Sequence, residues 1–147
     1  MMISTKGRYA LRMMLDLAMC GGEELVPLKD IAERQGISIK YLEQIVSALS
    51  KAGFVRSVRG TGGGYKLAKP PEDYTVGMIL RLTEGSLAPV SCLEFEENTC
   101  PRAAECMTLG VWSKLYGAIN DVVDNITLAD IIRENADKNN TGDMYCI

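Results

Sequence analysis

Two short helical segments joined by a glycine turn are the feature that most constrains the fold of this 147-residue chain. Pro27 is placed to open a helix over residues 28–34, since proline is favoured at the first helical position. Gly36 follows in a turn that needs a left-handed backbone conformation. Ser38 is then a typical N-cap for a further helix that runs to about residue 52. The pattern predicts a helix-turn-helix.

The second helix of this unit separates buried from exposed positions. Leu42, Ile45 and Leu49 recur at helical spacing and are expected to pack on the preceding helix, together with Ile37. The N-terminal turns of such a helix enter the major groove of DNA, where serine, lysine and glutamine contact bases or phosphates. The residues expected there are Ser38, Lys40, Tyr41, Glu43 and Gln44. Helix pairs of this shape also occur as plain packing units, so the next segment is needed to decide.

A basic hairpin with a glycine-rich tip follows this predicted recognition helix. Residues 54–59 and 65–69 favour strands on either side of the glycines. A wing has this form, because its tip approaches the duplex closely and its arginines enter the minor groove or contact phosphates. A nucleotide-phosphate loop is excluded, since no Gly-Lys-Ser/Thr follows the glycines and no helix begins after them. The basic residues that cluster here are Arg56, Arg59, Lys66 and Lys69. The wing residues expected to contact DNA are Arg56, Arg59 and Thr61.

The charge distribution agrees with this assignment. The net charge of −3 alone argues against nucleic acid as a partner. Residues 1–81, however, carry 12 basic and 8 acidic side chains, a net +4, whereas residues 82–147 carry 4 and 11, a net −7. A basic front half and an acidic back half indicate different roles, although chance asymmetry is the alternative.

An apolar stripe in the acidic back half predicts a dimerisation helix. Its members are Leu109, Trp112, Leu115, Tyr116, Ile119, Val122, Val123 and Ile126. Their spacing places them on one face of a helix. Such a stripe is more often ordinary core, but the N-terminal unit is nearly complete without it, so a partner helix is the expected counterpart. A two-fold homodimer would hold two recognition helices about one DNA turn apart and would require a palindromic operator.

These elements define the expected architecture. The chain should be mainly α-helical with a small β-hairpin wing, a winged helix-turn-helix followed by a long dimerisation helix. The predicted boundaries are 1–81 for the DNA-binding domain, 82–136 for the sensor loop and dimerisation helices, and 137–147 for a flexible tail. The chain has neither a membrane-length apolar run nor a secretory h-region, so a cytoplasmic location is expected. An enzyme is not expected, because no base–nucleophile pair can be identified.

Cys92, Cys100 and Cys106 lie in or beside the predicted loop that precedes the dimerisation helix. None of them forms a CxxC redox pair. Thiolates are suitable ligands for iron–sulfur clusters, zinc and Cu(I). The chain has no histidine, which excludes histidine-dependent triads and two-histidine metal sites. From the residues alone, a cluster, a thiol redox switch, zinc and no ligand all remain open.

Six segments carry a family resemblance: STKGRYA at 4–10, LKDIAERQGIS at 28–38, YLEQ at 41–44, VRG at 58–60, GGGY at 62–65 and NITL at 125–128. Together they closely resemble the IscR-like family of iron–sulfur regulators, which are winged-helix repressors. The resemblance covers nearly the whole chain apart from the tail. It implies a homodimer that represses or activates iron–sulfur, nitrosative-stress or cysteine-metabolism genes. It also implies an iron–sulfur cluster, expected to be [2Fe-2S], ligated by Cys92, Cys100 and Cys106.

Departures from the family pattern leave the fourth cluster ligand open. The family's histidine, three residues after the third cysteine, is Leu109 here. The acidic residue that nitric-oxide-sensing relatives carry in the first helix is Arg8 here, and the gap between the first two cysteines is longer than usual. The candidate ligands are Glu94, Glu96, Glu97, Glu105 and Cys146. The alternative function is a regulator of the same fold that responds to thiol oxidation, a small molecule or a partner protein without a cluster.

Overall fold

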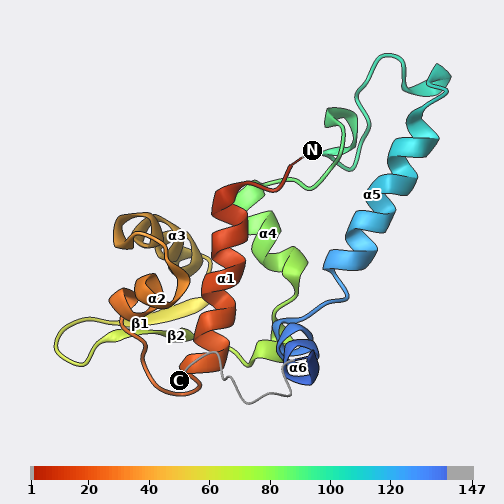
Figure 1. Cartoon of the computed structure of the whole chain (residues 1–147). Helices are drawn as coiled ribbons and strands as arrows, with labels where there is room; N and C mark the ends of the chain where they lie inside the picture. Colours follow the sequence, from red (N-terminus) through yellow and green to blue (C-terminus); the bar gives the residue numbers. More distant parts are fainter. Residues whose placement is uncertain (1, 139–147) are drawn as a thin grey trace.

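The structure is a computed structural model that describes residues 2–138, and it is mostly helical with one projecting β-hairpin (Figure 1). In chain order its elements are α1 (Thr5–Cys20), α2 (Leu28–Gln35), α3 (Ile39–Lys51), β1 (Val55–Val58), β2 (Gly64–Leu67), η1 (Pro71–Asp73), α4 (Val76–Glu84), η2 (Ser91–Leu93), η3 (Ala103–Glu105), α5 (Leu109–Val123) and α6 (Leu128–Lys138). The fold class predicted from the sequence is confirmed.

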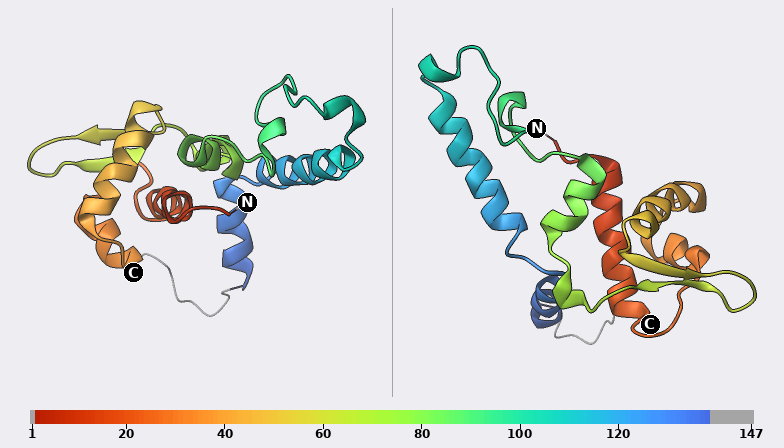
Figure 2. Two further views of the ribbon diagram at one scale, coloured as in Figure 1. Left: turned by 90° about the horizontal axis from the view of Figure 1, so that it is seen from above. Right: turned by 180° about the vertical axis from the view of Figure 1, so that it is seen from behind.

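The first helix, α1, lies at the centre of the molecule, with α2 and α3 on one side and α4 on the other (Figure 2). Ser4 is its N-cap, and the Ser4 hydroxyl accepts a hydrogen bond from the Gly7 amide at 3.1 Å. Met13, Met14 and Leu17 lie on the buried face of α1 and contribute to the main hydrophobic core. Because α1 contacts α2, α3 and β2 as well as α4 and α6, it links the hairpin side of the molecule to α4 and α6.

The predicted helix-turn-helix is present in α2 and α3. Gly36 ends α2 with φ 65° and ψ 35°, the left-handed conformation that glycine adopts without strain. The Ser38 hydroxyl then accepts from the Tyr41 amide at 3.2 Å and caps α3. Leu42 and Ile45 are fully buried, as expected. The structure differs in one detail, since Pro27 occupies the N-cap of α2 and not its first helical position.

The hairpin is joined to the helices along β2, and its glycine-rich tip projects beyond them (Figure 1). β1 and β2 pair antiparallel from Val55 opposite Leu67 to Val58 opposite Gly64, so the strands are shorter than predicted. The Val26 amide donates to the Tyr65 carbonyl at 2.8 Å, and the Tyr65 amide donates back at 2.9 Å, which joins the hairpin to the connection between α1 and α2. The glycine-rich tip extends away from the helices (Figure 1).

A buried tyrosine holds the start of β1 against the residues after β2. The Tyr74 hydroxyl donates to the Phe54 carbonyl at 2.8 Å and accepts from the Lys69 amide at 3.1 Å. Burial raises the pKa of Tyr74, so the phenol keeps the proton that it donates. The Phe54 ring packs edge-on against the Tyr74 ring, with centroids 5.6 Å apart.

The chain leaves this core after α4 and returns to it at α6. Leu128 is fully buried in the main core, and its amide donates to the Tyr74 carbonyl at 3.0 Å. Between these points the chain forms a long loop and α5, which extends away from the other helices (Figure 2). Arg81 of α4 joins α5 through its Nη2 atom, 2.8 Å from Asn120 Oδ1 and 3.0 Å from Asp124 Oδ2.

Candidate nucleic-acid interface and cysteine loop

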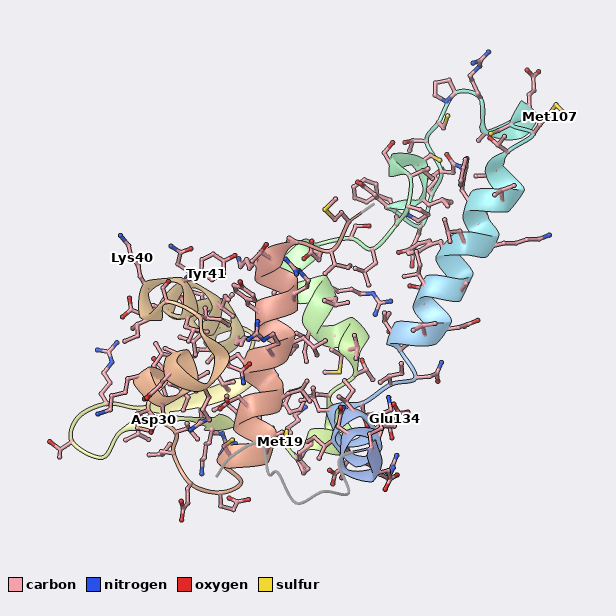
Figure 3. All side chains as sticks on the ribbon, in the orientation of Figure 1. Met19, Asp30, Lys40, Tyr41, Met107 and Glu134 are labelled. Carbon is pink, nitrogen blue, oxygen red and sulfur yellow. The ribbon has the colours of Figure 1, made fainter. Side chains whose placement is uncertain are left out.

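The N-terminal turns of α3 carry the residues predicted to contact DNA. Four of them are exposed: Ser38, Lys40, Glu43 and Gln44. Figure 3 shows Lys40 extending into solvent at this end of the helix. Tyr41 is half-buried, because its ring packs edge-on against Tyr9 of α1 with centroids 5.6 Å apart. The structure therefore brings all five residues to one end of α3, and Tyr41 also anchors that end to α1.

A buried polar network behind the recognition helix was not predicted from the sequence. The Asp16 carboxylate is fully buried and accepts from Arg34 Nε at 3.0 Å and Nη2 at 2.7 Å, a bidentate pair. It also accepts from the Gln35 side-chain amide at 2.9 Å, and Gln35 Oε1 accepts from Arg12 Nε at 3.0 Å. The network fixes the end of α2, and so the turn into α3, relative to α1. The one signal for this network in the sequence was Asp16, an acidic residue on the apolar face of α1.

The wing tip and α3 border an open groove of about 470 Å³. Arg59 lies exposed on the wing side of this groove, and Thr61 is exposed two residues further along the tip. Glu43 lies on the α3 side, with Lys51 at the other end of the same helix. The structure thus brings Arg59 of the wing close to the recognition helix.

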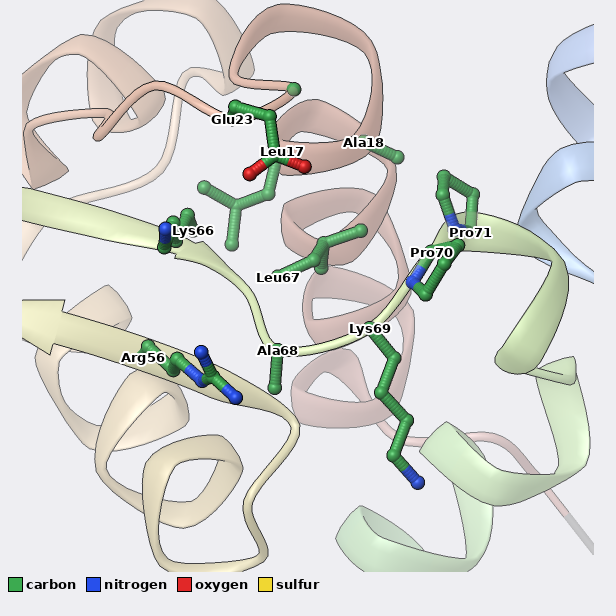
Figure 4. A pocket seen from close by; sticks show the side chains of 11 residues that line it. Leu17, Ala18, Glu23, Arg56, Lys66, Leu67, Ala68, Lys69, Pro70 and Pro71 are labelled. Carbon is green, nitrogen blue, oxygen red and sulfur yellow. The ribbon is translucent and has the colours of Figure 1, made fainter.

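The structure does not bring Arg56 to this groove. Arg56 lines a smaller pocket of about 240 Å³ at the base of the hairpin, next to the end of α1, together with Lys66 and Lys69 (Figure 4). Arg56 pairs with Lys66 in the strand register, so the two side chains share one face of the hairpin. The basic cluster predicted from the sequence is therefore divided into a set at the hairpin base and Arg59 near the tip.

The cysteine loop connects α4 to α5. Cys92 and Cys100 are half-buried, and Cys106 is exposed directly before α5. The Thr108 hydroxyl lies 3.4 Å from Cys106 Sγ, and this contact lowers the pKa of the thiol. Three thiols form a donor set that suits an iron–sulfur cluster. Within residues 2–138, however, no group of three or more cysteine or acidic side chains is gathered closely enough to hold a metal ion.

The positions considered for the fourth ligand are spread over the loop and α1. The loop glutamates are all exposed: Glu94, Glu96, Glu97 and Glu105. Leu109 begins α5, and Arg8 is exposed on α1, where its Nη2 donates to Thr5 Oγ1 at 3.1 Å. Cys146 lies outside the described residues.

One contact joins the start of this loop to the start of α1. The Glu84 carboxylate, at the end of α4, accepts from the Ser4 amide at 3.1 Å and from the Ser4 hydroxyl at 2.5 Å. Gly7 makes room for it, because a Cβ atom there would lie 2.2 Å from Glu84 Oε1. The N-cap of α1 is thus bound to the last residue before the loop.

The apolar stripe of α5 is not buried in the single chain. None of the residues of α5, all of which are described, is buried. Within the stripe, Val122 is 57% exposed and Leu115 is 43% exposed, and the other members are half-buried, while Val111 beside the stripe is 57% exposed. A helix with this composition is stable only against another apolar surface.

An exposed recognition helix, a glycine-tipped wing beside it and a long helix with an uncovered apolar face define a winged helix-turn-helix transcription regulator. The chain belongs to the Rrf2 family, whose model is described as an iron-dependent transcriptional regulator and matches residues 3–134. It is a DNA-binding regulator similar to IscR, and not an enzyme. Among the helices of the described residues, none has both the length and the apolarity to cross a bilayer.

Curated relatives and solved structures agree on this family. The chain is 46% identical to Protein rrf2 of Nitratidesulfovibrio vulgaris, over 91% of this chain and 89% of the relative. It is 43% identical to the HTH-type transcriptional regulator IscR of Photobacterium profundum, over 92% and 77% respectively. Among solved structures, CymR of B. subtilis, described as the global cysteine regulator, matches with 44% identity and a TM-score of 0.73, covering 89% of this chain and 95% of CymR. The T. potens IscR matches with 43% identity and a TM-score of 0.73, covering 94% and 90%.

Proposed function

We propose that this regulator is a homodimer that binds a palindromic operator, and that its cysteine loop binds a [2Fe-2S] cluster that controls the choice of operator. The observation that carries the cluster assignment is the position of Cys92, Cys100 and Cys106 in the loop that joins α4 to α5, in a chain whose relatives include IscR. The regulated genes would be iron–sulfur or related redox genes.

The DNA contacts follow from the chemistry of each side chain. Gln44 is suited to bidentate pairing with adenine, while Ser38 and Lys40 are suited to bases or phosphates. Tyr41, through its hydroxyl, and Thr61 are suited to phosphates. Glu43 can accept from cytosine but repels phosphates, so it tunes which sites are bound and adds little affinity.

The two arginines of the wing have different roles in this proposal. Arg59 lies beside the groove next to α3 and is suited to the minor groove or to phosphates. Arg56, at the base of the hairpin, makes a weaker contact with DNA.

The uncovered stripe of α5 supports the homodimer. Since α5 contributes no buried residue to its own chain, a second copy of α5 is the partner proposed for it. The two DNA-binding domains of the dimer would then present their recognition helices to successive turns of one face of the duplex.

The three cysteines would hold the cluster, which when bound supplies an oxidisable inorganic group in the loop. The chain's own residues would transmit the difference between the occupied and empty loop. An ordered loop fixes Glu84, which binds the N-cap of α1 through Ser4. Tyr9 of α1 in turn packs on Tyr41 of the recognition helix. Ligand binding in the loop can change operator preference only if it favours one arrangement of these contacts over another.

A thiol redox switch is the second candidate. It is favoured by the exposure of Cys106 and by the likeness to CymR of Staphylococcus aureus, which has been solved in an oxidised form and matches with 41% identity and a TM-score of 0.69. In that case the loop would respond to oxidation of its thiols and would hold no iron.

Anaerobic reconstitution with iron and sulfide separates the two candidates. The wild-type protein should acquire a visible chromophore with the Mössbauer signature of a [2Fe-2S] cluster. Each of Cys92→Ala, Cys100→Ala and Cys106→Ala should lose it and adopt the operator preference of the apo form, whereas Ser91→Ala, a loop change that removes no thiol, should keep it. Cys146→Ala and Glu-to-Gln variants at 94, 96, 97 and 105 identify the fourth ligand by the same signal. A native chromophore in all three cysteine variants would overturn the cluster proposal and leave DNA binding untouched.

A further inference from the structure

The groove between α3 and the wing is lined in part by residues of α3 that the contacts proposed above do not use. Ser50 and Lys51 follow Ser47 by three and four residues, so both lie next to Ser47 on the surface of α3. The three residues form one wall of the groove. Ser57 and Arg59 line the opposite wall, at the end of β1 and in the wing tip. The groove therefore lies between the two elements that would contact DNA.

This lining combines hydroxyl groups with two cations. Within residues 2–138, neither Lys51 nor Arg59 takes part in an ion pair. The acidic residue of the lining, Glu43, lies towards the N-terminal end of α3, away from Lys51. Lysine, arginine and serine side chains all contact phosphates in protein–DNA complexes, so the groove is suited to an anionic polymer backbone.

The geometry of B-DNA specifies which part of the duplex this groove would meet. Each sugar–phosphate strand separates a major groove from the neighbouring minor groove. With the N-terminal turns of α3 in a major groove and the wing tip in the adjacent minor groove, the strand between the two grooves must pass between α3 and the wing.

We propose that this groove holds one sugar–phosphate strand of the operator, and that Lys51 and Ser47 contact its phosphates. The proposal rests on the proposed DNA-binding function and adds residues that the sequence did not indicate. These contacts would set the depth to which α3 and the wing enter their grooves, while the bases themselves are read by Gln44 and Glu43. Ser47 and Lys51 are both exposed, so substituting them leaves the hydrophobic core intact.

The test compares affinity on two duplexes over a range of salt concentrations. One is the duplex that the wild-type protein selects from a random library, and the other is a shuffled duplex of equal length. Lys51→Gln should lower the affinity for both about tenfold and reduce the slope of log K against log salt by about 2, because the proposed homodimer loses one phosphate contact in each half-site and phosphate contacts carry no sequence information. Ser47→Ala should weaken both about twofold with an unchanged slope, since a hydroxyl carries no charge. Lys138→Gln, which removes a lysine of α6, is the matched control and should bind like the wild type.

A neutral methylphosphonate placed at each position of the selected duplex in turn locates the contact. At one position per half-site, the methylphosphonate should weaken binding of the wild-type protein about tenfold. The same modified duplex should bind the Lys51→Gln variant no more weakly than the unmodified duplex does. The inference would be overturned if Lys51→Gln bound DNA with the affinity and salt slope of the wild-type protein. It would also be overturned if the variant lost affinity only for the selected duplex, since that result would indicate a base contact. If the wild-type protein selects no duplex at all, the proposed function fails and this inference fails with it.

Discussion

Two regions of the molecule differ in how much of their own apolar surface they bury. The head consists of α1 to α4, the hairpin and α6, and it contains the whole hydrophobic core. The arm, residues 88–127, contributes no buried residue, although it includes the apolar stripe of α5. The head can therefore fold as a unit by itself, whereas the arm needs a further surface or ligand to hold its conformation.

This difference in buried surface matches the two roles proposed for the head and the arm, which are DNA recognition and sensing. DNA recognition needs side chains held in fixed positions, and the head provides them through buried packing and the Asp16 network. Sensing needs a segment with more than one accessible arrangement, which the lightly packed arm provides. Arg81 of α4 joins the two regions by hydrogen bonds to Asn120 and Asp124 of the arm, whereas Glu84 at the end of α4 bonds within the head, to Ser4.

The largest expected effect is the loss of the buried carboxylate in the head. Asp16→Ala removes the acceptor of Arg34 and Gln35 and should lower the free energy of unfolding by about 3 kcal/mol, as expected for breaking a buried ion pair. Urea denaturation measures it. Arg133→Ala, which removes an exposed ion pair with Asp130, is the control and should cost about 0.5 kcal/mol or less. Equal small losses for both variants would mean that the network does not stabilise the head.

The next effect concerns the arm. Leu115→Glu places a charge on the apolar stripe and should raise the dimer dissociation constant on the order of 100-fold, while the head keeps its fold. Sedimentation equilibrium gives the dissociation constant, and circular dichroism reports the helices. Lys114→Glu alters the charge on the opposite side of α5 and should leave the dimer intact. A dimer equally stable in both variants would rule out the stripe as the interface.

Sequence recognition should depend on the head alone. Gln44→Ala should remove about 2 kcal/mol of discrimination at one base position per half-site, and Glu43→Ala should broaden the range of sequences bound. Selection from a random duplex library, followed by sequencing, reveals both changes. An unchanged selected motif for either variant would reject the role given to that residue.

The division of the wing arginines predicts a smaller difference. Arg59→Ala should weaken operator binding about tenfold with a reduced salt slope, because this residue lies beside the groove next to α3. Arg56→Ala should weaken it about twofold or less, since its pocket lies at the base of the hairpin. Fluorescence anisotropy titrations at several salt concentrations compare the two. Equal losses would show that both ends of the hairpin contact the duplex.

The smallest effect lies at the joint between head and arm. The hydrogen bond from Arg81 lowers the pKa of Asp124. A lowered pKa in the folded state gives stability that is present above the unfolded value of about 4 and is lost as the pH falls through the folded pKa. Both side chains are more than a third exposed, so the contribution is about 0.5 kcal/mol. Unfolding of wild type and Asp124→Asn should differ by this amount at pH 7 and converge at low pH, and a constant difference would contradict the assignment.

Local signals made the head predictable. Gly36, Ser38 and the spacing of Leu42, Ile45 and Leu49 each act within a few residues, and the structure has the expected turn, cap and buried face. The spacing of the buried residues also predicted correctly that the N-terminal turns of α3 are exposed. The wing was likewise predicted from alternating residues around glycines, although its strands are shorter.

Contacts between distant residues could not be predicted in the same way. Asp16 meets Arg34 and Gln35 across 18 and 19 positions, and no local pattern pairs them. Arg56 and Arg59 are only three residues apart in the sequence, but strand alternation turns them to different sides of the hairpin, where they line different pockets. Whether the three cysteines converge depends on a loop with little buried surface, so their spacing alone does not fix their arrangement.

The dimer proposed for the exposed face of α5 would make the abundance of the regulator part of its control. In the proposed homodimer two chains must meet before the apolar face of either α5 is covered, so the concentration of dimers able to bind both half-sites rises with the square of the chain concentration while dimers are rare. Promoter occupancy would then have a threshold in copy number. A modest change in synthesis or degradation of the chain could change gene expression as strongly as a signal received by the cysteine loop.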